Sequence, residues 1–363
     1  MKSKNVLYGI SIAVALQLGM LAASAQTNIY LFTGYETNIT LAAGIYNITA
    51  YGAQGGNAAD SYGGLGVEME GQFNFSTPTT LTLLVGGSIS AIFGGGGGGG
   101  GGGFVVNGST PLVVAGGCGG GDYGGGNGGS GSIGTNGISG SGNGISSGFD
   151  GGGNGGTNGN GGNGSTGGGY PSGGGGGGGG FYSSGTAGSS GAGGGYSFLI
   201  GGGGGNGGYA PGGETGGNGG YGGGGGGGGY ADGGGGGGGG GYSGGGGANG
   251  DNTVGGGGGS IIDSSSITNL AEVSGIASPD DSTGNGEIII TVVSGVSAPT
   301  PPTIGITTVS SLPVVIWPAS ATNYVLQMTT NLNSPNWVTI SNGIPFVGLQ
   351  ITNAPGTAFF RLH

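Results

Sequence analysis

Positively charged residues are almost absent from this chain of 363 residues. Lys and Arg together number three, against 14 Asp and Glu, so charged residues make up 5% of the sequence and the formal net charge is −11. Two of the three, Lys2 and Lys4, lie at the N-terminus, and the third is Arg361. Nucleic-acid binding needs Lys or Arg to neutralise phosphates. The sequence therefore excludes nucleic acid as a partner.

Histidine and cysteine are equally scarce, with one residue of each, His363 and Cys118. Nucleophilic catalysis by a Ser/His/Asp or Cys/His device needs a histidine that its neighbours orient, and His363 is the last residue of the chain. A single cysteine leaves no disulfide within the chain. We therefore expect a protein that is not an enzyme, with no catalytic residue, no cofactor and no metal site.

Long apolar runs are missing outside the N-terminus, so we expect no membrane span in the mature chain. At the N-terminus, the two lysines precede the apolar stretch 6–23, and Ala23-Ser24-Ala25 has the small residues of a cleavage site. These features predict a signal peptide over residues 1–25 and a secreted or cell-surface protein. The alternative is an uncleaved membrane anchor, because the apolar stretch approaches the spanning length of about 20 residues.

Glycine, in contrast, fills 115 of the 363 positions. Composition predicts a glycine-rich domain over 26–293, a Pro-rich linker over 294–302 and a small β domain over 303–363. Within the glycine-rich domain, β-patterned residues lie at about 27–93, 104–116 and 260–293. The glycine-rich insert covers about 94–259.

Alternation of apolar and polar residues predicts the strands of the first domain. The segments 37–41 and 45–51 alternate on either side of a short turn, which predicts that they pair. Asn107-Gly108 between two apolar runs predicts a hairpin. The β-branched segment 287–293 completes one predicted β-sandwich, into which the glycine-rich stretch is inserted.

The glycines follow two patterns. Uninterrupted runs recur with similar length at 94–103, 173–180, 222–229 and 233–241, and two more polar segments keep glycine at every third position, from Gly128 to Gly140 and from Gly153 to Gly162. Extended threefold helices that carry glycine along one edge can lie side by side and share backbone hydrogen bonds. This predicts a bundle of polyglycine-II helices, with the runs at its centre and the polar segments at its rim. A flexible spacer is the alternative.

Four tyrosines punctuate the glycine runs at intervals of 12, 9 and 12 residues: Tyr209, Tyr221, Tyr230 and Tyr242. All three intervals are multiples of three, which predicts that the rings share one side of the bundle. They are candidate contact residues that stack on a sugar or a partner protein. The other interpretation, which we favour, is that they cap the bundle and pack on the β-sandwich.

Acidic residues give weaker signals. Asp280 and Asp281 beside Asn285 offer hard oxygen ligands for calcium, but their spacing matches no calcium loop and favours an acidic turn. Glu68 and Glu70 share one strand face, as paired catalytic carboxylates would. A solvated strand face is the favoured interpretation.

Five motifs occur in the order found in one known family: 44–56 (GIYNITAYGAQGG), 83–87 (LLVGG), 102–117 with PLVVAGG, 240–245 (GGYSGG) and 284–288 (GNGEI). Over about 27–293 the chain resembles the glycine-rich extracellular domain of the anaplastic lymphoma kinase and leukocyte tyrosine kinase type. The resemblance implies a tumour-necrosis-factor-like β-sandwich with a large insert of polyglycine helices, which binds protein ligands outside the cell. The chain carries none of the motifs of the kinase domain, and the family's cysteines are missing.

The tail resembles a C-terminal module that is common in secreted bacterial proteins and is fibronectin-III-like in pattern. Short strands alternate with Pro, Asn and Gly, and Trp317 and Trp337 are core candidates. The resemblance implies an appended extracellular domain with no chemistry of its own.

These observations predict an all-β protein that is structural or adhesive, bacterial and extracellular. An extracellular protein or glycan is the expected kind of ligand. The alternatives are a receptor-like ectodomain that binds a protein ligand and, more remotely, an ice-binding or matrix-scaffold protein whose Ser/Thr/Asn-rich rim orders water.

Overall fold

The computed structural model describes most of the first 295 residues and part of the remainder. The described residues are 26–59, 61–89, 95–122, 124–142, 151–165, 173–209, 214–229, 233–250, 252–295, 305–309, 312–316, 325–332, 336–341, 349–350 and 359–362. The predicted signal peptide, Tyr230 and Trp317 lie outside them. The chain forms two compact units, Met1–Gly295 and Val296–His363.

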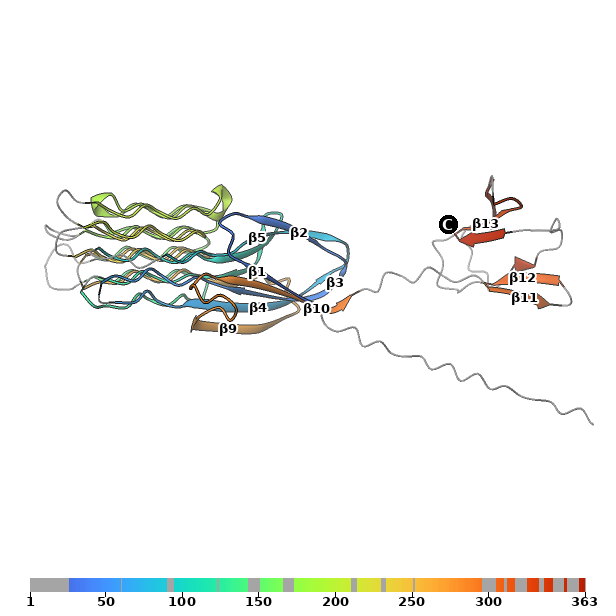
Figure 1. Ribbon diagram of the computed structural model, residues 1–363, viewed down its shortest axis with the longest axis horizontal. Coiled ribbons are helices and arrows are strands. Elements are labelled where there is room, and N and C mark those ends of the chain that lie inside the picture. The colour runs from blue at the N-terminus through green and yellow to red at the C-terminus, as the bar shows by residue number, and fades with distance from the viewer. Residues whose placement is uncertain are drawn as a thin grey trace, which may run out of the picture. The chain divides into compact units, whose positions relative to one another are not determined.

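The first unit contains two antiparallel five-stranded sheets (Figure 1). One has the order β1 (Thr27–Leu31), β10 (Glu287–Gly295), β3 (Gly44–Tyr51), β4 (Gly66–Phe75) and β9 (Thr268–Ile276). The other has the order β2 (Thr37–Leu41), β5 (Thr79–Leu84), β6 (Gly103–Asn107), β7 (Thr110–Ala115) and β8 (Ile261–Ile262). Apart from the strands, the described elements are two short 3-10 helices, η1 (Ser189–Gly191) and η2 (Phe198–Ile200). The fold is therefore all-β, as predicted.

One predicted pairing is wrong. β2 and β3 follow each other across a short turn, but β2 pairs with β5, while β3 pairs with β4 and β10. The chain changes sheets between β2 and β3, which alternation cannot reveal because either partner satisfies it. The hairpin at Asn107-Gly108 is confirmed: Asn107 pairs with Thr110, and Gly108 takes a φ of 58°.

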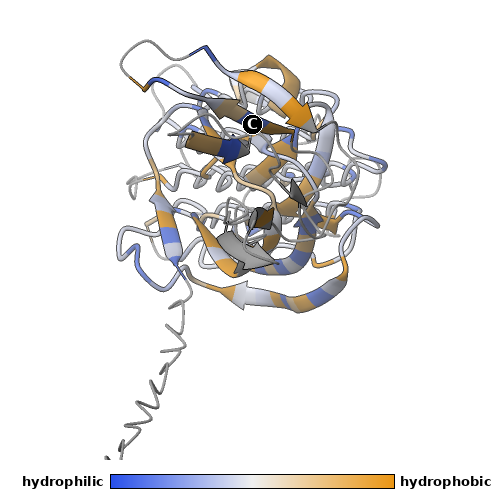
Figure 2. Ribbon diagram, turned by 90° about the vertical axis from the view of Figure 1, so that its right-hand side faces the viewer, coloured by the Kyte–Doolittle hydropathy of each residue, from blue (hydrophilic) through white to orange (hydrophobic). Residues whose placement is uncertain are grey.

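Inward-facing side chains of both sheets form the main core. In β4 the buried Val67, Met69 and Phe73 alternate with the half-buried Glu68, Glu70 and Gln72. They pack with residues such as Leu81, Val105 and Ile290 from the other strands. Figure 2 shows the alternation as bands of contrasting hydropathy along the strands.

Beyond the sheets, the glycine-rich stretch forms extended segments that run side by side (Figure 1). The run 233–241 lies among six of them. Its N–H groups donate to three segments, at steps of three residues. Gly237 and Gly240 donate to Gly97 and Gly100 of the first segment. Gly235, Gly238 and Gly241 donate to Gly173, Gly176 and Gly179 of the second, and Gly236 and Gly239 donate to Thr253 and Gly256 of the third. Its carbonyl groups accept hydrogen bonds from three other segments. The carbonyls of Gly237 and Gly240 accept from Gly120 and Gly117. Those of Gly235 and Gly238 accept from Gly228 and Gly225, and those of Gly236 and Gly239 accept from Ala248 and Gly245. From Gly235 to Gly240, the backbone of this run is therefore satisfied laterally by neighbours on all sides.

Polar side chains take over this role at the rim. Ser183, Thr186 and Ser189 lie three residues apart on one outer segment, and their hydroxyl oxygens accept hydrogen bonds from the N–H groups of Gly161, Gly164 and Gly174. The donor–acceptor distances are 3.1, 2.9 and 2.6 Å. Among the described residues, no further segment at the rim supplies a carbonyl group on the outer side, and these hydroxyl groups accept the hydrogen bonds instead. This explains why the rim is rich in Ser, Thr and Asn.

A second cluster joins the glycine segments to the sheets. Phe181 and Phe198 come from the glycine-rich stretch, and their rings stack with centroids 5.1 Å apart. Phe198 also contacts Phe104 of β6, with ring centroids 5.1 Å apart. Leu84, Val106 and Val114 complete this buried group, the junction cluster. The bundle therefore packs on the β2–β8 sheet through an apolar cluster that is separate from the main core.

The second unit contains two three-stranded sheets. Their orders are β11 (Gly305–Val309), β12 (Leu312–Ile316), β15 (Leu349–Gln350), and β14 (Val338–Ser341), β13 (Leu326–Thr329), β16 (Phe359–Leu362). In the second sheet, the Arg361 guanidinium lies 4.3 Å from the Trp337 ring centroid and donates to the Gln327 side-chain oxygen at 2.9 Å. Within the described residues of the chain, no helix has the length and apolarity of a membrane span.

Candidate binding groove

The candidate tyrosines do not form one row. Gly225 and Gly228 donate to Gly238 and Gly235, so the runs that contain them are antiparallel. Tyr221 and Tyr242, at their outer limits, therefore lie at the same end of the bundle. Tyr209 lies at the opposite end, because the preceding Gly208 donates to Gly227.

The prediction that the rings share one side of the bundle is thus wrong for Tyr209. Because the chain reverses its direction between the runs, tyrosines spaced by a multiple of three residues do not have to lie near one another. Tyr209 is 61% exposed. Tyr221 and Tyr242 are half-buried and pack against the junction cluster around Phe181. For these two rings the structure agrees with the cap interpretation, while Tyr230 lies outside the described residues.

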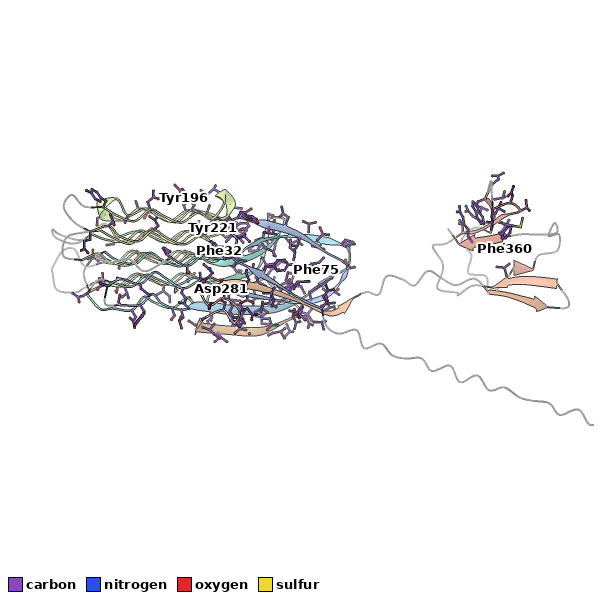
Figure 3. The ribbon with its side chains drawn as sticks, in the orientation of Figure 1. Phe32, Phe75, Tyr196, Tyr221, Asp281 and Phe360 are labelled. Carbon is purple, nitrogen blue, oxygen red and sulfur yellow. The ribbon has the colours of Figure 1, made fainter. Side chains whose placement is uncertain are left out.

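Tyr221 leads to a groove that the sequence did not indicate. Its ring contacts Phe32, with centroids 6.3 Å apart, where the strands meet the glycine segments (Figure 3). Phe32 follows β1 and forms part of a groove of about 460 Å³. The groove is lined by Ile29, Tyr30, Leu31, Phe32, Thr33, Tyr35, Thr37, Leu83 and Val85. A volume in this range, with apolar walls and a few hydroxyl groups, is typical of ligand sites.

The groove lies on the side of the sandwich where β1 and β2 are the outermost strands of their sheets. Leu83 and Val85 of the buried core are among its lining residues, and exposed side chains form its walls: Ile29 at 47%, Leu31 at 46% and Tyr35 at 64% exposure. None of the nine lining residues is charged. The site therefore offers apolar contact and hydroxyl groups to a ligand.

Acidic groups flank this uncharged surface. Glu36, between Tyr35 and Thr37, is exposed, and its charge contributes, after burial, to the raised pKa of Tyr221. On the other side, the exposed Asp280 donates its backbone N–H to Glu287, and Glu287 is the register partner of Leu31. A ligand in the groove thus meets the negative charge of Glu36 beside the lining residues and, beyond Glu287, that of Asp280.

The paired-carboxylate candidates have structural partners. The Tyr51 hydroxyl donates to Glu68 at 2.9 Å, and Tyr51 is the register neighbour of both Glu68 and Glu287. Asp281 accepts hydrogen bonds from Thr283 and Asn285, as the favoured acidic turn predicts. Among the described residues, no group of three His, Cys, Asp or Glu side chains is arranged to hold a metal ion.

Two carboxyl groups near Tyr51, those of Glu287 and Glu70, predict that the stability of the fold depends on pH. Burial raises the pKa of Glu287, which is fully buried and has one oxygen without a hydrogen bond among the described residues. Burial and the neighbouring Glu68 raise the pKa of Glu70. A folded-state pKa above the unfolded value makes stability fall as pH rises through the folded pKa. We expect a higher melting temperature at pH 5 than at pH 7.5, with a smaller difference in Glu287→Gln.

The control for this experiment is Glu214→Gln, which removes one exposed charge at a distant position. It should leave the pH dependence of the melting temperature unchanged. The pKa of Asp281 is lowered, because hydrogen bonds from Thr283 and Asn285 outweigh the effect of its burial. This group makes stability rise with pH, but only at pH values more acidic than the two compared. An equal pH dependence in Glu287→Gln and in the parent would contradict the role of Glu287.

Cys118 is predicted to be chemically inert in the folded protein. Its thiol is fully buried and donates to the carbonyl groups of Ala53 and Gly64, at 3.0 and 2.7 Å. Burial raises its pKa to about 12, so the reactive thiolate is scarce. A soluble aromatic disulfide reagent at pH 8 should release no chromophore from the native chain, and one equivalent after unfolding in guanidinium. Rapid release from the native chain would contradict this burial.

Comparison with models of known protein families finds no match, and comparison with curated protein sequences finds none either. The groove was missed from the sequence because its residues come from β1 and the segment that follows it, from β2, and from the end of β5, and these strands belong to two different sheets. The one available signal was the exposed apolar segment from Ile29 to Tyr35.

Proposed function

We propose that this chain is a secreted or cell-surface adhesive protein without enzymatic activity. In this proposal the glycine-rich stretch is a rigid body of polyglycine-II helices, and the sheets are a tumour-necrosis-factor-like β-sandwich that presents the groove. The observation that carries the proposal is the bonding of run 233–241 to six neighbours at steps of three residues. That step is the repeat of an extended threefold helix, which has no internal hydrogen bonds and must be satisfied laterally.

The strand order supports the proposed type of sandwich. The first and last strands of the unit, β1 and β10, are neighbours in one sheet, and the chain changes sheets repeatedly between them. Such crossing is typical of double-sheet jelly rolls. The glycine segments enter between β7 and β8, while the β5–β6 connection supplies the run that includes Gly97 and Gly100.

A rigid body joined to a binding surface suits adhesion, because a preorganised surface loses little conformational entropy when it binds. The junction cluster around Phe181 fixes the glycine body to the strands that carry the groove. The proposed fibronectin-III-like module at the C-terminus adds a separate domain. The groove also favours the second candidate, a receptor-like ectodomain, which would bind one soluble protein ligand.

Adhesion is tested with beads that carry the exported chain, presented to bacterial cells, polysaccharide matrices and extracellular-matrix proteins. We expect retention on at least one of these surfaces under washing and no turnover in a broad panel of hydrolase substrates. Nanomolar binding of a single soluble protein, with no surface retention, would favour the receptor-like candidate. Substrate turnover would overturn both.

A further inference from the structure

The outer edge of β1 carries unused backbone hydrogen-bonding groups beside the groove. The Val292 N–H donates to the Gln26 carbonyl at 3.0 Å, and the β1–β10 register makes these two residues direct partners. Hydrogen-bonded and non-hydrogen-bonded pairs alternate in an antiparallel ladder. Asn28 and Tyr30 therefore bond to β10, whereas the backbone groups of Ile29 point away from it.

By the same alternation, the backbone groups of Thr27 and Leu31 also point away from β10. The N–H and carbonyl groups of Thr27, Ile29 and Leu31 therefore line the free edge of β1. β1 has one neighbouring strand, β10, within the part of the chain that the structure describes. An edge of this kind is a template for another extended segment, which adds to the sheet through main-chain hydrogen bonds. Side chains from every second residue of that segment would enter the adjacent groove.

Charge narrows the identity of this segment. The groove itself is uncharged; the exposed Glu36 lies between two of its lining residues, and the exposed Asp280 bonds to Glu287, the register partner of the lining residue Leu31. This chain has no Lys or Arg between Lys4 and Arg361, so its first unit, beyond the predicted signal, has no basic residue with which a second copy could complement the flanking acids. Electrostatic complementarity therefore favours a different chain, with basic residues on both sides of an apolar stretch.

We propose that the edge of β1 binds an extended segment of another protein, with apolar side chains at alternate positions and Lys or Arg at both ends, as an added strand. This inference rests on the proposed adhesive function and names the partner of its groove. Main-chain bonds supply affinity, and the apolar pocket beside Phe32 and Tyr35 selects the side chains that enter it.

The test measures binding of fluorescent peptides to the full chain by polarisation. The probe alternates valine and threonine and has two lysines at each end, and a matched peptide has glutamates instead. We expect the lysine peptide to bind, more weakly as salt rises, and the glutamate peptide not to bind. Ile29→Pro removes an outward N–H at an edge position, where proline is tolerated. It should weaken binding about tenfold relative to Ile29→Ala, which keeps that N–H.

Leu31→Ala and Leu270→Ala form a matched pair, since the two side chains are 46% and 45% exposed on opposite edge strands of one sheet. Only Leu31→Ala should weaken binding. No binding of the lysine peptide, or equal affinity in Ile29→Pro and Ile29→Ala, would overturn strand addition. Binding of a neutral glycan that Tyr35→Ala abolishes would overturn it too. Bead adhesion, measured in parallel, separates these outcomes from failure of the adhesive function itself.

Discussion

Replacing Gly237 with valine is expected to destabilise the first unit by about 3–5 kcal/mol. A Cβ at this position would overlap the carbonyl oxygen of Gly225 and lie 2.8 Å from that of Gly226. The neighbouring segment must move, which costs about 1–3 kcal/mol for overpacking. The bonds from this segment to the run, from Gly225 to Gly238 and from Gly228 to Gly235, would be lost, at about 1 kcal/mol each. Equilibrium unfolding in guanidinium, followed by far-UV circular dichroism, measures the change.

The matched control is Gly134→Val. A Cβ at Gly134 would meet a single atom, the Ser132 hydroxyl oxygen at 3.6 Å, and the residue is exposed. This variant should stay within about 0.5 kcal/mol of the parent, as surface substitutions do. Asn158, another rim position, is unsuited as a control because its φ of 54° disfavours a β-branched side chain. Equal stability of the Gly237 and Gly134 variants would show that the glycine run is not closely packed.

Replacing Phe181 with alanine is expected to cost about 3–5 kcal/mol, because it empties a fully buried site at the junction. Phe181 stacks on Phe198, and its loss leaves a cavity between the glycine segments and β6. The sandwich and the bundle should then unfold at separate denaturant concentrations, since this cluster couples them. Tryptic digestion is uninformative in a chain so poor in Lys and Arg, so limited proteolysis with elastase is the second measurement.

Tyr182→Ala is the control for this variant, because the adjacent ring is 50% exposed. Its ring meets Phe181 edge-on at 5.0 Å between centroids, so a loss of about 1 kcal/mol is expected. A single unchanged unfolding transition in Phe181→Ala would contradict the coupling role of the cluster.

The strands that the sequence predicted are those with a one-sided pattern. Alternation at 37–41 and the β-branched run at 287–293 placed β2 and β10 to within a few residues. β9 was missed because most of its residues are exposed, so the segment has no apolar period to detect. β1 was missed, and with it the groove beside it, because its apolar residues Ile29, Tyr30 and Leu31 are consecutive and do not alternate with polar ones.

Period three was informative within a segment and misleading between segments. In 151–157 the exposed Asn154 and Thr157 alternate with the buried Gly153 and Gly156, as the spacing of the glycines predicts. Tyr209 failed the same rule because the chain reverses its direction between Tyr209 and Tyr221. Local periodicity fixes the phase of a side chain around its own axis, while the positions of the turns decide which rings meet.

Hydrogen–deuterium exchange of the amides in 233–241 tests the central claim most directly. If each N–H in this run is held by a neighbouring helix, its exchange should be as slow as that of the amides in β3, at the centre of the first sheet. Protection should include Gly235 through Gly241, whose bonds reach three different segments. Exchange of these amides at the rate of an unstructured peptide, while β3 stays protected, would contradict an ordered polyglycine body and leave the stretch a flexible spacer.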